Sequence, residues 1–320
     1  MEKTPEREYP FPRYLSAKKS VDDRALNRPV WQALQAALPI SQPGAPLRVL
    51  EIGAGIGTML ERMIDTGLLT FAHYTALDQE RENIIYARQR LTAWGEKRGL
   101  AAHWQGRHLA LEGNGCQIEA SFVENDLFSF VEQVSGSQSW DLLVAHAFLD
   151  LMDLPSTLLQ VFSLLATDRL TQPVFYFTIN FDGVTILEPV IEAAFDEQVI
   201  HLYHRTMDER RVQGKPSGDS RTGRRMFHAL RQSGASLVAA GASDWVVFAD
   251  QFGNYPQDEA YFLHFIIHTM DQALRGHPEL DAERFQHWIA ARHAQVERGE
   301  LVLIAHQLDF VGHPSLKGSA

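Results

Sequence analysis

Three glycines follow an acid at a spacing that suits the binding of a ligand by bare backbone. Gly53, Gly55 and Gly57 alternate with small or apolar residues directly after Glu51 and Ile52. We predict that a buried strand ends at Glu51-Ile52 and that the glycines turn the chain tightly into a helix. Glycine is needed there because a Cβ would block both a positive φ and the close approach of a ligand. Such strand-to-helix turns bind nucleotides in doubly wound sheets.

The spacing of the glycines separates two kinds of nucleotide. The dinucleotide fingerprint places its third glycine where this chain has Thr58. The pattern Glu-x-Gly-x-Gly-x-Gly of residues 51–57 instead resembles motif I of the class I S-adenosylmethionine (SAM)-dependent methyltransferases. SAM carries no phosphate, so its amino acid end needs backbone donors and an acid, the role that the resemblance gives to Glu51. A glycine turn that binds no ligand is the alternative.

Two further acids follow the next expected strands. The resemblance implies that Asp78 binds the ribose hydroxyls of SAM, and a carboxylate can accept from both hydroxyls. An NAD-binding fold places an acid similarly, and a helix cap is the other alternative. The resemblance also implies that Asp126 binds the exocyclic amine of adenine beside the backbone of Leu127. The alternative for Asp126 is the N-cap of the following helix.

His146 ends the expected fourth strand, at the position that faces the transferred methyl group in the family. A neutral imidazole is a natural general base near neutral pH, so we predict a catalytic role for His146. The alternative is that it shapes the methionine end of the SAM site through its backbone. The segment 145–148 lacks both the Asn-Pro-Pro-Tyr of adenine and glutamine N-methyltransferases and the aspartate of metal-dependent catechol-type enzymes. A metal site of His146, Asn180 and Asp182 is a further alternative, but we expect no metal.

Candidate substrate-binding residues lie after the fifth expected strand and in a polar insert. Asn180 and Asp182 end that strand, where the alternative is a plain turn. His204, Arg205 and Arg221 lie in the insert, and an arginine there could hold a carboxylate in bidentate fashion. A solvated surface loop is the alternative for the insert.

A histidine pair lies in a second, helical insert. His264 and His268 are four residues apart and therefore share a helix face. This is also zinc-ligand spacing, but the glutamate of His-Glu-x-x-His is missing. We therefore expect substrate-pocket or core histidines rather than metal ligands.

The elements that must position these residues alternate between strand and helix from about residue 47 to 180. This alternation predicts an α/β fold with a doubly wound parallel sheet and right-handed crossovers. The resemblance implies seven strands, the last of them antiparallel and inserted beside the fifth. The expected strands are 48–52, 73–78, 120–123, 140–146 and 173–179, followed by 236–240, 245–249 and 301–306.

The same pattern divides the chain into a core and additions to it. Inserts that leave the carboxyl ends of parallel strands lie on the ligand side, so we expect them to build a substrate pocket and its cap. The predicted parts are a leader or lid (1–46), a SAM-binding core (47–183 and 223–250), a substrate-side insert (184–222), a helical cap (251–299) and a final strand with tail (300–320).

The amino-acid composition limits the kinds of binding partner that the protein is expected to have. The 320 residues are 45% hydrophobic and 22% charged, as is usual for a globular protein. A net charge of −11 argues against a nucleic-acid footprint. No apolar run approaches the roughly 20 residues of a membrane span, and the N-terminal residues carry no signal-peptide core. The single cysteine, Cys116, which we expect in an exposed turn, suits a reducing cytoplasm.

These observations together predict a SAM-dependent methyltransferase. We expect transfer to an O or N nucleophile of a small polar metabolite or natural product, with no nucleic-acid or membrane partner. The alternatives are a non-catalytic SAM-binding protein, an aminopropyltransferase and an NAD-dependent oxidoreductase. The methyl acceptor and the oligomeric state are left open at this point.

Overall fold

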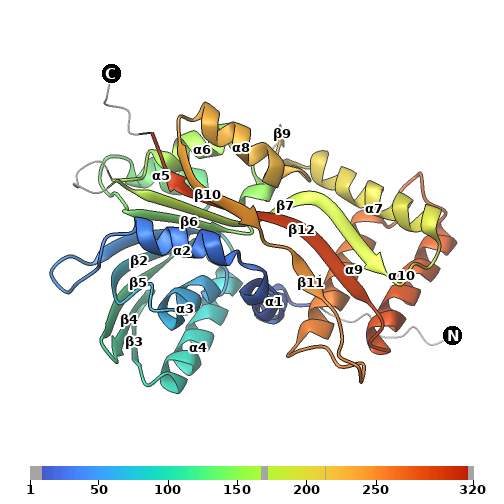
Figure 1. Cartoon of the computed structure of the whole chain (residues 1–320), viewed down its shortest axis with the longest axis horizontal. Coiled ribbons are helices and arrows are strands. Elements are labelled where there is room, and N and C mark those ends of the chain that lie inside the picture. The colour runs from blue at the N-terminus through green and yellow to red at the C-terminus, as the bar shows by residue number, and fades with distance from the viewer. Residues whose placement is uncertain (1–8, 167–171, 213, 316–320) are drawn as a thin grey trace.

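A computed structural model describes residues 9–166, 172–212 and 214–315 of the chain. Its main feature is a sheet whose strands follow the order β10-β12-β7-β6-β1-β2-β5-β4-β3, with β11 paired to β12 (Figure 1). The strands are β1 (Leu47–Ile52), β2 (Phe71–Asp78), β3 (Ala101–Gln105), β4 (His108–Gly113), β5 (Cys116–Glu124), β6 (Leu142–His146), β7 (Val174–Glu188), β10 (Ser236–Ala242), β11 (Trp245–Val247) and β12 (Val302–His313), and a separate pair is formed by β8 (Arg211–Val212) and β9 (Lys215–Pro216).

The centre of the sheet is parallel. Each neighbouring pair from β5 through β2, β1 and β6 to β7 is parallel, whereas β12 runs antiparallel between β7 and β10. The central strand β6 is buried on both faces, which explains its continuous apolar sequence. The structure therefore confirms the expected doubly wound sheet with an antiparallel strand inserted beside the fifth.

Helices cover both faces of this sheet. One core cluster packs α2 (Arg28–Ala37), α3 (Thr58–Asp65) and α4 (Arg81–Lys97) on one face. A second cluster packs α5 (Leu127–Val134), α6 (Leu154–Phe162) and α8 (Thr222–Gln232) on the other. The short 3-10 helix η1 (Leu149–Leu151) follows β6.

A third core cluster lies beyond the parallel sheet, where β7 and β12 continue as a long antiparallel pair (Figure 1). Apolar side chains of these strands and of β11 pack there against four helices. These helices, which with the strand ends we call the accessory lobe, are α1 (Phe11–Ala25), α7 (Ala193–Asp208), α9 (Glu259–Leu274) and α10 (Ala282–Glu297).

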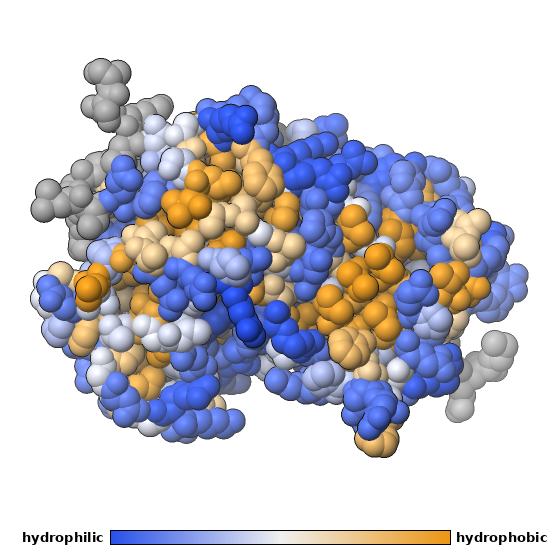
Figure 2. All heavy atoms as spheres, viewed as in Figure 1, coloured by the Kyte–Doolittle hydropathy of each residue, from blue (hydrophilic) through white to orange (hydrophobic). Residues whose placement is uncertain are grey.

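The other face of these strands exposes apolar side chains. Ile304 of β12 lies between Ile186 of β7 and Val246 of β11 in the sheet register. Ile186 and Val246 are both well exposed, and Figure 2 shows apolar surface over this part of the molecule. None of the described helices is both long enough and apolar enough to cross a membrane.

Three local predictions were wrong. The polar stretch before the third core strand forms the hairpin β3–β4, which continues into β5, so that strand begins at Cys116 rather than at residue 120. Cys116 is half-buried on this strand instead of lying in an exposed turn. The fifth core strand, β7, also continues to Glu188, well past the expected end at residue 179, because its second half pairs with β12.

Candidate active site

The glycine turn adopts the backbone conformation that its sequence predicts. Gly53, Gly55 and Gly57 have φ values of 67°, 54° and 80°, in the left-handed region that favours glycine. Gly57 is the N-cap of α3, so the turn joins the end of β1 directly to that helix. The N–H of Gly55 donates a hydrogen bond of 2.7 Å to Oδ2 of Asp78.

The sheet register brings the key residues to one edge. The Cα partners of Ile52 at the end of β1 are Leu77 in β2 and Ala145 in β6. The next residue in each strand is therefore Gly53, Asp78 or His146, so these three lie at the carboxyl edge of adjacent strands. This is the edge at which open α/β sheets bind ligands.

Asp78 is anchored at this edge by both of its carboxylate oxygens. Its Oδ1 accepts from the N–H of Glu80 at 2.8 Å and from Nδ2 of Asn83 at 3.1 Å, while Oδ2 accepts from Gly55. Burial raises the pKa of Asp78, although these hydrogen bonds oppose the rise. Asp78 thus holds the glycine turn against the start of α4.

Glu51 is fully enclosed at the end of β1. Its side chain accepts a hydrogen bond of 2.6 Å from the hydroxyl of Tyr74, and the residue is 2% exposed. Burial raises the pKa of Glu51 to about 8, against the lowering effects of Tyr74 and of the charge on Arg62. The carboxyl group is therefore mostly protonated at neutral pH, and a cation placed beside it would favour its ionised form.

The turn is covered by two of the chain's own side chains. A Cβ built on Gly53 would collide with the ring of Phe148, which follows β6. A Cβ built on Gly55 would lie 3.1 Å from Cδ1 of Leu15 in α1. The bare backbone of the turn is thus in close contact with the leader helix and with the loop after β6.

Two hydrogen bonds fix the tautomer and the orientation of His146. Its Nε2 lies 2.9 Å from Oδ2 of Asp22, and its Nδ1 lies 2.7 Å from Oγ1 of Thr178, the next-strand partner of His146. Burial lowers the pKa of His146 to about 4, although Asp22 opposes this shift. The imidazole is therefore neutral at pH 7. Since Asp22 is a carboxylate, Nε2 carries the proton and Nδ1 accepts from the Thr178 hydroxyl.

Asp22 belongs to the leader helix α1, and the sequence analysis did not single it out. Besides His146, it accepts hydrogen bonds from Lys18 and, at 2.9 Å, from Nε1 of Trp245. Burial alone would raise the pKa of Asp22, but Lys18 and His146 together lower it below its usual range. A lysine and an aspartate four residues apart on a helix are a common surface pair. This spacing therefore gave no sign that the pair is buried against a histidine 124 residues further along.

Two residues at this edge have a strained backbone. Ala147 and Ile179 directly follow His146 and Thr178, and their φ values are +50° and +56°. A positive φ is a genuine outlier for a β-branched residue such as isoleucine. The N–H of Ile179 donates to Asp309 at 2.8 Å, and that of Ala147 donates to the carbonyl of Thr178 at 2.9 Å. Strain of this kind concentrates at functional sites, which supports the assignment of this edge.

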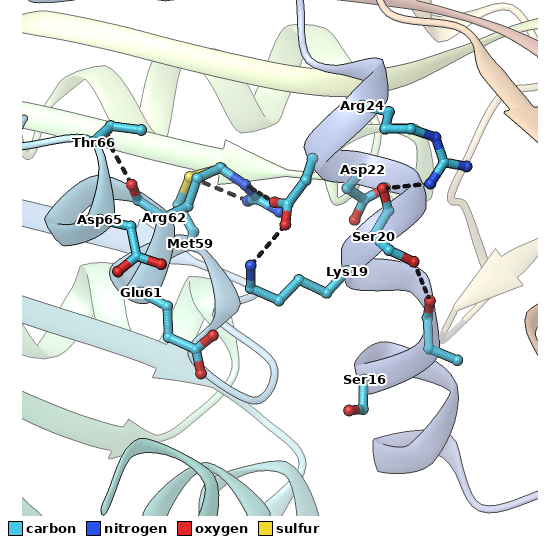
Figure 3. Close-up of polar contacts among 12 residues, drawn as sticks. Ser16, Lys19, Ser20, Asp22, Arg24, Met59, Glu61, Arg62, Asp65 and Thr66 are labelled. Carbon is cyan, nitrogen blue, oxygen red and sulfur yellow. Dashed lines mark hydrogen bonds and ion pairs between the residues drawn. The ribbon is translucent and has the colours of Figure 1, made fainter. Parts of the chain in front are cut away.

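Ion pairs fix α1 across the edge. Figure 3 shows Arg62 extending from α3 toward α1, where its Nε donates to Asp23 at 2.7 Å. Arg24 and Ser20, further along the same helix, both donate to the fully buried carboxylate of Glu259 in α9. Helix α1 is therefore held between the parallel-sheet core and the accessory lobe.

Other predicted residues lie in contacts within the protein, and Asp126 matches its alternative as a helix N-cap. Asn180 and Asp182 lie inside β7, so the prediction that they end a strand and the alternative of a plain turn were both wrong. Asp126 is exposed and caps α5 by accepting from the N–H groups of Phe128 and Ser129, both at 3.1 Å, while Leu127 is buried in the core. Asn180 donates from Nδ2 to the carbonyl of Leu308, although its buried Oδ1 has no partner among the described residues. Asp182 accepts from Arg224 at the start of α8.

The polar residues of the first insert do not converge on His146. His204 lies 2.9 Å from the hydroxyl of Thr185, and burial lowers its pKa to about 4. Arg205 forms ion pairs with Glu209 and Glu279, and Arg221 is an exposed residue at the start of α8.

The two histidines of α9 pack within the accessory lobe. Nδ1 of His264 lies 2.8 Å from Nδ1 of His293, and the ring of His268 is centred 4.7 Å from that of Tyr9. In the described ranges, no group of three or more histidine, cysteine and acidic side chains is arranged to hold a metal ion.

Comparison with known proteins gives likenesses of fold only. No protein-family model matches the chain, and no curated protein matches it by sequence. One similar solved structure is a SAM-dependent methyltransferase from Methanosarcina mazei, with 13% identity, a TM-score of 0.44 and coverage of 89% of this chain and 97% of that one. Another is a cyclopropane synthase from Mycobacterium tuberculosis, with 9% identity, a TM-score of 0.41 and coverage of 95% and 100%. A third is a plantazolicin methyltransferase in complex with S-adenosylhomocysteine, with 13% identity, a TM-score of 0.36 and coverage of 93% and 86%.

Proposed function

We propose that this chain is a SAM-dependent methyltransferase that acts on an O or N nucleophile of a small polar molecule. One observation carries the proposal: a glycine turn with three positive φ values ends β1 and is tied through Gly55 to the acid that ends β2. This arrangement presents bare backbone and a carboxylate side by side, as a nucleoside with an amino acid end requires. The strand order, with β12 antiparallel beside β7, also supports the interpretation of residues 51–57 as a SAM-binding motif.

The residues at the turn fit SAM in kind. Its amino acid end would lie against the backbone of Gly53 and Gly55, with Glu51 close by, and its ribose would lie against Asp78. Leu15 and Phe148 now fill the space that a Cβ would occupy at the two glycines. Both side chains come from outside the parallel strands, so their displacement leaves the register of β1 and β2 intact.

The chain's own contribution would be alignment, water exclusion and proton acceptance. SAM supplies an electrophilic methyl group on a sulfonium. Helix α1 closes over the carboxyl edge and excludes water, and the fixed orientation of His146 positions a neutral base there. The nitrogen able to accept a proton is Nδ1, once the Thr178 hydroxyl turns away, because Nε2–H is held by Asp22. The carboxylate of Asp22 would then stabilise the imidazolium.

The overall charge supports a small substrate, because a net charge of −11 repels nucleic acid. The single cysteine supports a reducing compartment, and we place the enzyme in the cytoplasm.

Incubation with methyl-deuterated SAM and a metabolite extract tests the proposal. We expect a small-molecule product that carries the label and is identified by mass spectrometry. The Gly55→Ala variant should lose SAM binding and product, because its methyl group would occupy the turn. Gly67→Ala is the matched control, since Gly67 also has a positive φ, of 71°, but open space around it. Binding of SAM without any labelled product would favour a non-catalytic SAM-binding protein.

A further inference from the structure

A half-buried carboxylate that the proposed mechanism does not use lies four residues after His146. Asp150 is the central residue of η1, which follows β6 at the carboxyl edge. Its Oδ1 is shielded from solvent and forms no hydrogen bond with any residue that the structure describes. A buried charged oxygen without a partner is costly to a folded protein, which makes it a candidate for ligand binding.

Nearby cations do not neutralise this carboxylate through a bond. Lys18, whose charge acts on Asp150, donates its hydrogen bond to Asp22 instead. Arg62 pairs with Asp23 at 2.7 Å. Arg210 also acts on Asp150 electrostatically, but its side chain is exposed. Lys18 is thus bonded to another acid, and Asp150 forms no bonded ion pair with any cation among the residues that the structure describes.

The surroundings of Asp150 are polar and aromatic. Burial raises the pKa of Tyr203 in α7, and the charge of Asp150 adds to the rise. Burial also raises the pKa of Tyr14 in α1, where Asp150 contributes less than Asp22. Both phenols are therefore neutral at pH 7 and offer oxygen lone pairs to a donor. Burial raises the pKa of Asp150 itself to about 6, so it is mostly ionised at neutral pH.

The backbone that carries Asp150 is braced from the first insert. The N–H of Asp219 donates to the carbonyl of Asp150 at 3.1 Å, and the hydroxyl of Ser217 donates to the carbonyl of Leu151 at 2.6 Å. Gly218, with a φ of 97°, packs so closely that a Cβ there would lie 3.1 Å from the Asp150 carbonyl oxygen. The backbone at Asp150 is thus held in place before any ligand arrives, which lowers the entropic cost of binding.

We propose that Asp150 binds a protonated amine on the methyl acceptor. The acceptor is then a small molecule with a primary or secondary ammonium group rather than a neutral alcohol or a carboxylic acid. The ammonium supplies both the charge and the hydrogen-bond donors that Asp150 lacks. This inference rests on the proposed function, because it assigns the acceptor of the same active site.

Calorimetric titration of the full chain with benzylammonium and with benzyl alcohol, its neutral counterpart, tests the assignment at pH 7.5. The wild type should bind benzylammonium roughly ten- to a hundredfold more tightly than the alcohol, as expected for a charge-assisted hydrogen bond. Asp150→Asn should abolish this preference. Asp153→Asn, which changes an exposed acid three residues away, should keep it.

Folding does not confound the comparison. Asp150→Asn removes a half-buried charge without a bonded cation, so its midpoint of urea unfolding should equal or exceed that of the wild type. Equal affinity of the wild type for the two probes, or an undiminished preference in Asp150→Asn, would overturn the amine assignment.

A parallel titration with SAM separates this inference from the proposed function. If the protein does not bind SAM but binds benzylammonium through Asp150, the proposed methyltransferase function is wrong and the amine site at Asp150 stands. If the protein binds SAM but shows no preference for the amine, the amine assignment is wrong and the proposed function stands.

Discussion

The buried contacts of Asp22 predict a large loss of stability on Asp22→Asn. The side chains of Asp22, Lys18 and His146 are only 3%, 6% and 8% exposed. Removal of one partner from a buried ion pair costs about 3–5 kcal/mol, because the other charge stays buried. The NH2 end of the asparagine amide would also oppose a donor, either Nε2–H of His146 or Nε1–H of Trp245, because both oxygens of Asp22 accept hydrogen bonds. We therefore expect the free energy of unfolding to fall by about 3 kcal/mol.

Asp258→Asn is the matched control, since Asp258 also joins the body of the protein to α1. It pairs with Arg13, and the two side chains are 51% and 55% exposed, so the loss should stay below about 1 kcal/mol. Urea unfolding of the three proteins measures both losses. Similar small losses in the two variants would refute the buried network at His146.

The stabilising contribution of Asp22 should also depend on pH in a defined direction. The folded-state pKa of Asp22 is lowered, so its contribution is fully present above the usual carboxyl pKa and is lost as the pH falls through the lowered value. The stability advantage of the wild type over Asp22→Asn should thus be constant from pH 5 upward and shrink in stronger acid. An advantage that grows toward acid pH would contradict the assigned ionisation of Asp22.

Three further predictions follow from the same contacts. The pKa of Glu51 is raised to about 8, so its stabilising contribution is present below pH 4.5 and is lost as the pH rises to 8. The free energy of unfolding of Glu51→Gln should therefore fall less over this pH range than that of the wild type. An equal fall in the two proteins would disprove the raised pKa of Glu51. Leu15→Ala should tighten SAM binding about fivefold, because about 1 kcal/mol of apolar contact no longer has to be displaced. A weaker affinity by calorimetry would argue against the claim that Leu15 covers the glycine turn. The imidazole of His146 should stay neutral down to about pH 4 in a nuclear magnetic resonance titration, and titration near pH 6.5 would exclude the buried environment.

The sequence was most informative where structure is local. The turn at Gly53 and the acid at Asp78 could be predicted because an apolar run, glycines and an acid lie close together in the chain. The parallel sheet also followed from the alternation of strands and helices, which permits few right-handed arrangements. The antiparallel strand beside the fifth was predicted from the family resemblance. Positive φ values at the glycines and the bond between Gly55 and Asp78 are the structural form of that motif.

Contacts between distant segments could not be predicted from pattern alone. Asp22 meets His146 only because α1 folds across the carboxyl edge. The hairpin β3–β4 was missed because its strands are short, half-exposed and joined at Gly106, which made the segment resemble a loop. In each case tertiary packing, rather than sequence periodicity or secondary-structure propensity, determines which residues meet or which element forms.

Calorimetric titration with SAM, S-adenosylhomocysteine and NAD tests the central claim most directly. The arrangement of the glycine turn with Asp78 predicts that SAM and S-adenosylhomocysteine each bind at one site per chain and that NAD does not bind. The Gly55→Ala variant should lose both interactions, whereas Gly67→Ala should keep them. Binding of NAD in the absence of any SAM binding would contradict the account.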